Sequence, residues 1–169
     1  MAGEQEKRME IVFRQVPRRP DVSVVLLDWS VRESFHSLDY LNQQTVARER
    51  YELIWVEYGD RRADGVERRL RDSLERERHP AIDCWMTLGM PSSIYYHKHL
   101  AYNVGILASA GRIVVFCDSD AIFRETFIES IIRSFDDDPN IVLHLDEIRN
   151  NRKAFYPFNY PSIAEVERE

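Results

Sequence analysis

The sequence predicts an α/β fold in which helices cover both faces of a mostly parallel sheet. Short apolar runs alternate along the chain with segments of helical periodicity. The two strongest runs, 22–27 and 113–117, are continuous rather than alternating, which is typical of parallel strands that are buried on both faces. With 169 residues, 44% of them apolar, the chain has the length of one domain with a sizeable core.

The first half of the chain predicts two strands and two helices. Residues 1–20 are charged, end in Pro17-Arg18-Arg19-Pro20 and indicate an extended lead-in. The charged segment after the second strand has a narrow apolar stripe, as on an exposed helix. The predicted elements are a strand at 22–27, a helix within 32–45, a strand at 53–56 and a helix at 61–78.

The second half continues the same alternation. Gly111 ends the helix that follows the third strand, and the run Asp136-Asp137-Asp138-Pro139 ends the next helix. The predicted elements are a strand at 81–88, a helix at 95–110, a strand at 113–117, a helix at 126–135 and a fifth strand at 141–145.

Composition excludes several classes of protein. A net charge of −6 argues against a general nucleic-acid binder, because neutralising phosphates requires clustered Lys and Arg. Cys84 and Cys117 lie in apolar stretches without a metal-ligand spacing, which indicates buried, reduced thiols and a reducing compartment. The charged N-terminus predicts no signal peptide, and no segment approaches the ~20 apolar residues of a spanning helix. We expect a cytoplasmic protein, or one that is peripheral to a membrane.

Asp118-Ser119-Asp120 directly follows the clearest predicted strand. Ligands of parallel sheets bind at the carboxyl ends of the strands. Two carboxylates at such a position can hold one divalent cation, or divide between a metal and a ribose. Asp136 and Asp138 have the same spacing, but they follow a helix and precede Pro139, so we predict a solvated turn there.

Four segments around these carboxylates resemble the family-two inverting glycosyltransferases. A helix at 38–45 ending in Asn-Gln precedes a strand at 51–60, whose Glu-Tyr-Gly-Asp stands where the family has Asp-Asp-Gly-Ser. Ala-Tyr-Asn-Val-Gly at 101–105 resembles the family's Ala-Arg-Asn-x-Gly, and 110–120 resembles its strand ending in Asp-x-Asp. Order and spacing agree over about residues 22–140. The resemblance implies the GT-A fold, a Rossmann-like α/β/α sandwich.

The resemblance also implies a nucleoside pocket. Asp28 and Trp29 would line the base pocket, with Trp29 offering its ring to the nucleobase. Glu57 stands where the family's Asp binds the base or ribose. Asp28 replaces a Thr of the family, Glu57 replaces an Asp, and Tyr58 replaces the second Asp. The nucleobase is therefore left open by the sequence.

The diphosphate would be bound through a metal. Asp118 would hydrogen-bond the ribose or base, and Asp120 would coordinate Mg²⁺ or Mn²⁺. Lys98 begins the helix before the Asp-x-Asp strand. It is either a surface residue, the favoured interpretation, or a ligand of the diphosphate.

An inverting transferase also needs a general base that removes the proton of the acceptor hydroxyl. In the family this base is an acidic residue well beyond the Asp-x-Asp. Asp146 and Glu147 are the candidates here, although a solvent contact at the strand end is the favoured interpretation. The aromatic and acidic tail at 151–169 is expected to begin an acceptor region. Its run 155–161 either stacks on an acceptor sugar or covers an apolar edge.

The expected function is the transfer of a sugar from a metal-bound nucleoside-diphosphate sugar, a UDP-sugar, to a glycan, lipid or protein acceptor with inversion. Residues 21–150 would form the nucleotide-sugar-binding domain. One alternative is a binding or scaffolding domain without catalysis. A second is a sugar nucleotidyltransferase, which usually has a Gly-rich basic loop after the first strand. Here Asp28-Trp29-Ser30 stands at that position.

Overall fold

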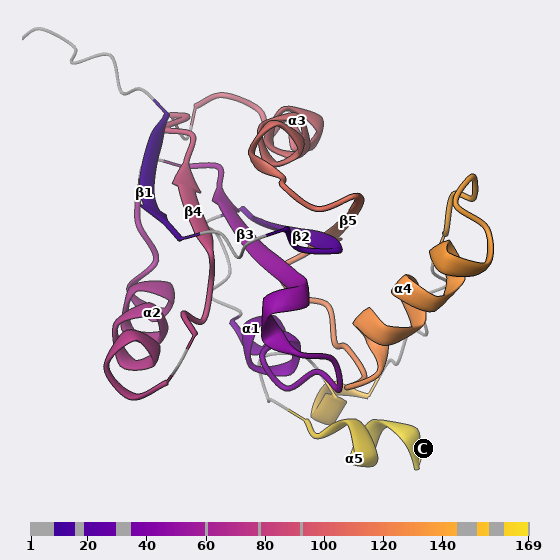
Figure 1. Cartoon of the computed structure of the whole chain (residues 1–169). Coiled ribbons are helices and arrows are strands. Elements are labelled where there is room, and N and C mark those ends of the chain that lie inside the picture. Colours follow the sequence, from indigo (N-terminus) through magenta and orange to yellow (C-terminus); the bar gives the residue numbers. More distant parts are fainter. Residues whose placement is uncertain are drawn as a thin grey trace, which may run out of the picture.

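The computed structural model describes residues 9–15, 19–29, 35–59, 61–77, 79–91, 93–144, 152–155 and 161–168. Its centre is a five-stranded sheet with the strand order β1-β4-β3-β2-β5 (Figure 1). The strands are β1 (Glu10–Arg14), β2 (Val22–Asp28), β3 (Tyr51–Glu57), β4 (Cys84–Thr87) and β5 (Ile113–Asp118). β2 to β5 are parallel, and β1 is antiparallel to β4. The predicted α/β fold with a mostly parallel sheet is confirmed.

The direction in which strands are added to the sheet reverses at β2. From β2 the chain proceeds outward to β3 and β4, and it then returns to the other side of β2 as β5. A ligand of an open α/β sheet binds in the crevice at this reversal, outside the carboxyl ends of the two strands. In this chain that position lies at the carboxyl ends of β2 and β5.

Helices cover both faces of the sheet (Figure 1). They are α1 (His36–Leu41), α2 (Asp64–Arg76), α3 (Lys98–Ala108), α4 (Phe127–Asp137) and α5 (Ile163–Glu167), with the 3₁₀ turns η1 (Arg48–Arg50) and η2 (Lys153–Phe155). Leu41 of α1, Val66 of α2 and Ile128 of α4 belong to one buried core. Ala101 and Ala108 of α3 belong to a second core on the opposite face. Among the described residues no helix is long and apolar enough to cross a membrane.

Small residues let α3 lie close against the sheet. Its buried positions are Ala101, Gly105 and Ala108, which share one face of the helix. A Cβ added at Gly105 would lie only 2.2 Å from a methyl carbon of Val25 in β2. This close packing fixes the helix axis over the sheet and places Lys98, the first residue of α3, near the carboxyl end of β5.

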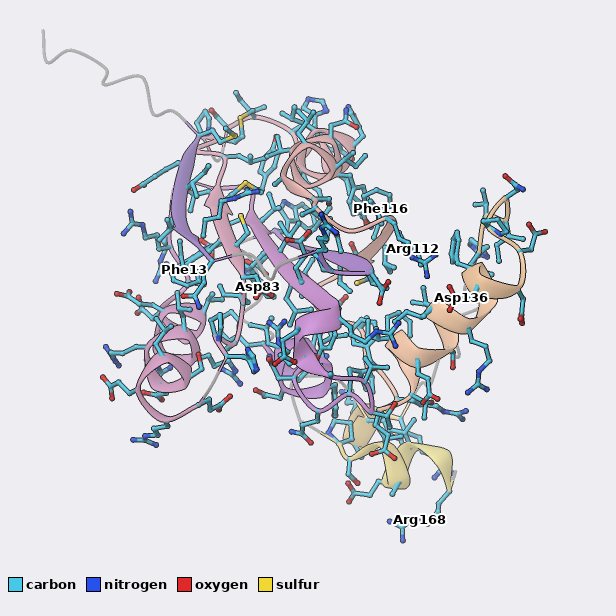
Figure 2. All side chains as sticks on the ribbon, in the orientation of Figure 1. Phe13, Asp83, Arg112, Phe116, Asp136 and Arg168 are labelled. Carbon is cyan, nitrogen blue, oxygen red and sulfur yellow. The ribbon has the colours of Figure 1, made fainter. Side chains whose placement is uncertain are left out.

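Two of the predicted elements were wrong. Residues 10–14 lie in the expected lead-in, but they form the edge strand β1, whose Val12 and Phe13 pack against the core (Figure 2). This strand was not predicted because its apolar run is only three residues long and lies between the charged residues Glu10 and Arg14. Conversely, residues 141–144 of the expected fifth strand form no strand, and Val142 is 95% exposed. An apolar run forms a strand only when it can pair with the edge of a neighbouring strand.

Candidate functional site

Three acidic residues end neighbouring strands at one edge of the sheet. Asp28 at the end of β2 is in register with Glu57 at the end of β3. On the other side of β2, Leu27 is in register with Asp118 of β5. Asp118 and Glu57 therefore lie at the same edge of the sheet, and both flank the strand at which the order reverses.

The side chains at this edge divide between the two faces of the sheet. Trp55, two residues before Glu57, packs in the core beneath α1 and α2, and alternation along the strand gives Glu57 the same face. Asp118 instead contacts α3, through Lys98 and Tyr102.

Glu57 is fully buried and holds the start of α2. Its Oε1 accepts hydrogen bonds from Trp55 Nε1 at 3.2 Å and from the backbone N of Ala63 at 3.1 Å. Ala63 is the residue that precedes α2. Burial raises the pKa of Glu57 to about 7, the bond from Ala63 opposes this rise, and the neighbouring Asp28 adds to it. In this arrangement Glu57 positions a helix terminus, and its contact with a nucleoside stays a prediction.

The free energy of unfolding is expected to fall as the pH rises from 4.5 to about 7, because folded Glu57 retains a proton that the unfolded chain has already released. Over this window the loss corresponds to about 3 kcal/mol. Glu57→Gln, which is uncharged throughout, should lack the loss. Thermal unfolding of both proteins at pH 5 and pH 8 measures it, and the contributions of other groups cancel in the comparison. Equal pH dependence in the two proteins would show that Glu57 is ionised when folded.

Asp28 and Ser119 join the ends of β2 and β5. Both residues are buried. Ser119 Oγ donates a hydrogen bond to Asp28 Oδ1 at 3.2 Å, and the backbone N of Ser119 donates to the carbonyl oxygen of Leu27 at 3.0 Å. The middle residue of Asp118-Ser119-Asp120 therefore fixes the loop to β2, while the two flanking aspartates are exposed.

An aromatic cluster lies next to the end of β2. Trp29, which is 56% exposed, stacks on Tyr96 with ring centroids 4.8 Å apart and planes 20° apart. Tyr96 in turn meets the edge of Tyr58, and the Tyr58 hydroxyl donates to the carbonyl oxygen of Tyr95 at 2.8 Å. The sequence analysis did not select Tyr58 or Tyr96 as site residues. The pair Tyr95-Tyr96 just before the helix that precedes the Asp-x-Asp strand was the available signal.

Lys98, the candidate ligand of the diphosphate, forms an ion pair with Asp118, the predicted ligand of the ribose or base. Lys98 Nζ lies 2.6 Å from Asp118 Oδ1, and the hydroxyl of Tyr102 lies 3.5 Å from the same oxygen. The two charged side chains are 43% and 50% exposed. Asp118 thus combines a direct ion pair with access to solvent.

Asp120 is exposed on the turn that follows β5. The turn is attached to α1 through His36, a buried residue that the sequence analysis did not select. Burial lowers the pKa of His36, and hydrogen bonds with the backbone of Asp120 and Ala121 oppose this effect. A neutral imidazole therefore supports the backbone of the turn, while Asp120 itself is exposed.

Asp118 and Asp120 offer carboxylates that could hold a divalent cation together with the phosphates of a bound ligand. Within the described residues no group of three or more His, Cys, Asp or Glu side chains could hold a cation alone. Mg²⁺, however, is commonly bound by one or two carboxylates, with substrate phosphates and water completing its coordination. Two carboxylates at the end of β5 match that donor set.

Asp136 and Asp138, the look-alike pair with the same spacing as Asp118 and Asp120, lie at the end of a helix rather than at the end of a strand. Asp136 lies in the last turn of α4 and forms an ion pair with Arg112, the residue before β5 (Figure 2). Asp138 follows the helix and accepts a hydrogen bond from the backbone N of Asn140 at 2.9 Å. Both aspartates are exposed, as the predicted solvated turn requires.

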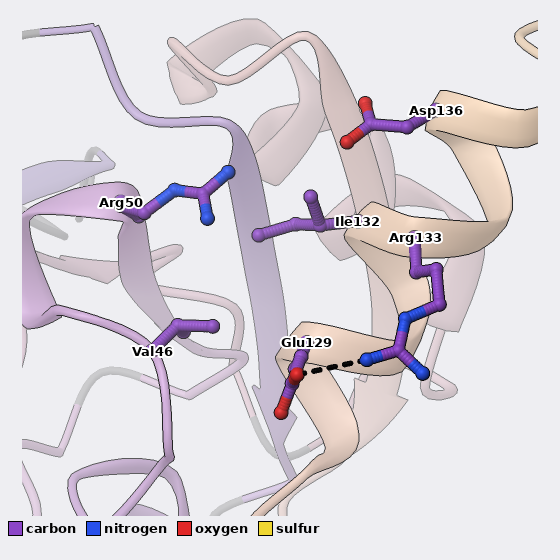
Figure 3. Close-up of a pocket in the computed structure, with 6 residues that line it drawn as sticks. All are labelled: Val46, Arg50, Glu129, Ile132, Arg133 and Asp136. Atoms are coloured by element: carbon purple, nitrogen blue, oxygen red, sulfur yellow. Dashed lines mark hydrogen bonds and ion pairs between the residues drawn. The ribbon is translucent and has the colours of Figure 1, made fainter.

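Two surface hollows in the described part of the chain lie outside this edge. One, of about 490 Å³, is lined by Asp64, Glu67, Arg68 and Arg71. The other, of about 220 Å³, lies between η1 and α4 (Figure 3) and is lined by Val46, Arg50, Glu129, Ile132, Arg133 and Asp136. Neither includes a predicted site residue. The candidate site is the open edge formed by the strand ends rather than a closed pocket.

This edge lies partly within a segment that is similar to a known protein family. The family described as Glycosyl transferase family 2 matches residues 95–163, a range that includes α3, β5, Asp118-Ser119-Asp120 and α4. The resemblance to family-two glycosyltransferases is confirmed. The match does not extend to Asp28, Trp29 or Glu57, whose proposed roles stay predictions. No curated protein matches the chain.

Two solved structures show the same fold. The crystal structure of S. aureus TarS 1-349 is 17% identical, with a TM-score of 0.54, over 69% of this chain and 32% of that chain. The crystal structure of S. aureus TarS is 17% identical, with a TM-score of 0.53, over 69% of this chain and 20% of that one. The likeness shows the GT-A-like fold, and this chain spans about a third or less of either protein.

The candidates for the general base are not placed. Asp146 and Glu147 lie outside the described residues, and so do residues 156–160 of the aromatic run.

Proposed function

We propose that this chain binds a nucleoside-diphosphate sugar, a UDP-sugar, as the donor-binding part of an inverting glycosyltransferase. The observation that carries the proposal is the position of Asp118-Ser119-Asp120. These residues end β5 where the strand order reverses, inside the segment that matches the family. Strand ends at such a reversal are where α/β sheets bind their ligands.

Each residue of the edge has a proposed role. Trp29 stacks on the nucleobase, Asp28 and Glu57 shape the nucleoside end, and Asp118 hydrogen-bonds the ribose or base. Asp120 holds Mn²⁺ or Mg²⁺. When bound, that cation would neutralise the diphosphate and so stabilise the departing nucleoside diphosphate. The acceptor is a glycan, lipid or protein, and Asp146 and Glu147 stay the candidates for the base that activates it.

UDP is expected to quench the fluorescence of Trp29, and Trp29→Ala should weaken UDP binding by about 1–3 kcal/mol, the scale of a lost stacking contact. Half of the Trp29 surface is exposed, while Trp55 and Trp85 are buried, so the quenching should be specific to Trp29. Fluorescence titration with UDP in the presence of Mn²⁺ measures both effects. Unchanged affinity in folded Trp29→Ala would make Trp29 a packing residue.

Tyr96 decides which face of Trp29 the base uses. The centroids of Trp29 and Tyr96 are 4.8 Å apart, too close to admit a base between the rings. If Tyr96 supports Trp29 from behind, Tyr96→Ala weakens UDP binding, whereas a base that displaces Tyr96 would bind Tyr96→Ala more tightly. Tyr95→Ala is the matched control, because Tyr95 is 83% exposed and engages Tyr58 only through its backbone oxygen. It should leave the affinity unchanged.

A further inference from the structure

Lys98 places a positive charge directly on the first carboxylate of Asp118-Ser119-Asp120. Its Nζ lies 2.6 Å from Oδ1 and 2.7 Å from Oδ2 of Asp118, so both carboxylate oxygens face the ammonium. Tyr102, one turn along α3, flanks the pair: its hydroxyl is 3.5 Å from Asp118 and its ring centroid is 5.6 Å from Nζ. Lys98 and Tyr102 share one face of the helix.

No other Lys or Arg lies on α3, all of whose residues from Lys98 to Ala108 are described. The family motif that 101–105 resembles has Arg where this chain has Tyr102. Gly105 packs closely on Val25, so α3 lies directly against the sheet. The charge that this helix presents to Asp118 is therefore the charge of Lys98, and it can leave Asp118 only by rotation of the lysine side chain.

An ammonium and a divalent cation that share one carboxylate at this range repel each other, so they compete for it. A metal–carboxylate bond is about 2.0–2.6 Å long, so a cation on Asp118 would meet Nζ within a few ångströms, and the two positive charges would repel strongly. A nucleotide diphosphate changes this balance because it brings several negative charges. Lys is a compact charge on a flexible stem, and phosphate is one of its usual ligands.

We propose that Lys98 is an exchangeable counter-ion of Asp118. Without nucleotide it neutralises Asp118 and competes with a divalent cation for that carboxylate. When the cation and the nucleotide arrive together, Asp120 holds the cation, Lys98 rotates from Asp118 to the diphosphate, and Asp118 is left to hydrogen-bond the ribose or base. The site thereby selects the metal–nucleotide complex over the free metal. This inference rests on the proposed function, and it assigns Lys98 a role in ligand selection at the same site.

The test measures Mn²⁺ binding alone and UDP binding at saturating Mn²⁺, both by calorimetry, on the wild type and on Lys98→Met. For Mn²⁺ alone, Lys98→Met should bind roughly twofold to fivefold more tightly, the scale set by losing a half-exposed charge pair. For UDP at saturating Mn²⁺, the same variant should bind more weakly than the wild type. Lys98→Arg retains the charge and should restore weak Mn²⁺ binding. Lys153→Met, at another lysine of the chain, should match the wild type in both titrations.

Failure of this inference can be distinguished from failure of the proposed function. Unchanged or weaker Mn²⁺ binding in Lys98→Met overturns the counter-ion role, and the proposed function stands if UDP binding to the wild type still requires Mn²⁺. If UDP binds tightly but no variant binds Mn²⁺, both the competition and the proposed metal are overturned. Tighter Mn²⁺ binding together with unchanged UDP affinity overturns the transfer of Lys98 to the diphosphate.

Discussion

Arg48→Met is expected to lower the free energy of unfolding by about 3–5 kcal/mol, the usual cost of breaking a buried ion pair by removing one partner. Arg48 Nη2 lies 2.7 Å from Asp83 Oδ2, and the two side chains are 11% and 2% exposed. The guanidinium also donates to the carbonyl oxygens of Tyr51 at 2.9 Å and Pro80 at 3.1 Å, and to Asn42 Oδ1 at 3.2 Å. A methionine side chain replaces none of these hydrogen bonds.

Most of this loss in the free energy of unfolding arises because the substitution leaves the buried carboxylate of Asp83 without its ion-pair partner. Asp83 is buried just before β4 (Figure 2), and its Oδ2 also accepts a hydrogen bond from the backbone N of Leu53 at 2.7 Å. Burial raises the pKa of Asp83, and Arg48 counteracts that rise. Without Arg48, the carboxylate must either stay charged in the core or take up a proton. Both alternatives destabilise the folded chain at neutral pH.

Arg50→Met is the matched control. Arg50 belongs to the same 3₁₀ turn, η1, and pairs with Asp21 at 2.7 Å, but these side chains are 46% and 28% exposed. An exposed pair of this kind contributes about 0–1 kcal/mol. Urea unfolding of the three proteins measures the difference. Equal losses for Arg48→Met and Arg50→Met would show that the Arg48 network is no more stabilising than a surface pair.

The buried parallel strands could be predicted because their residues carry the signal locally. Val22–Asp28 and Tyr51–Glu57 are buried along their whole length, and each contains a continuous apolar run, at 24–27 and at 53–56. β1 and the run 141–145 could not be distinguished in this way. Both are short apolar stretches among charges, and only the presence of an edge of β4 beside β1 makes the first a strand. That information lies in the tertiary structure.

In the candidate site, too, some residues could be placed from the local sequence and others only from the tertiary structure. The order of strands and motifs predicts where Asp118 and Lys98 lie, because both are attached to the regular elements β5 and α3. Tyr96 and His36 reach the site through the path of a loop and the packing of a short helix, which no local pattern specifies. Glu57 is an intermediate case. Its spacing of two from the buried Trp55 indicates the face it takes, and hence that it is buried.

Asp120→Asn is expected to remove most of the metal dependence of UDP binding. In the wild type, Mn²⁺ should raise UDP affinity by on the order of a hundredfold, about 2.7 kcal/mol. The reason is electrostatic. A diphosphate approaches the carboxylates of Asp118 and Asp120 on a chain of net charge −6, and like charges repel at short range. A bound divalent cation turns that repulsion into attraction. Because Asp120 is exposed on a turn, the substitution should leave the fold intact.

Asp138→Asn is the matched control, because it removes a carboxylate from the second Asp-x-Asp spacing of the chain. Asp138 is also exposed, but it follows α4 and bonds to the backbone of Asn140, away from the strand ends. Calorimetric titration of UDP with and without Mn²⁺ on the wild type and both variants compares the two positions. Asp138→Asn should retain the full dependence on Mn²⁺, because its carboxylate faces no nucleotide. Metal-independent binding in the wild type, or equal losses in the two variants, would remove Asp120 as the metal ligand and with it the proposed role of Asp118-Ser119-Asp120.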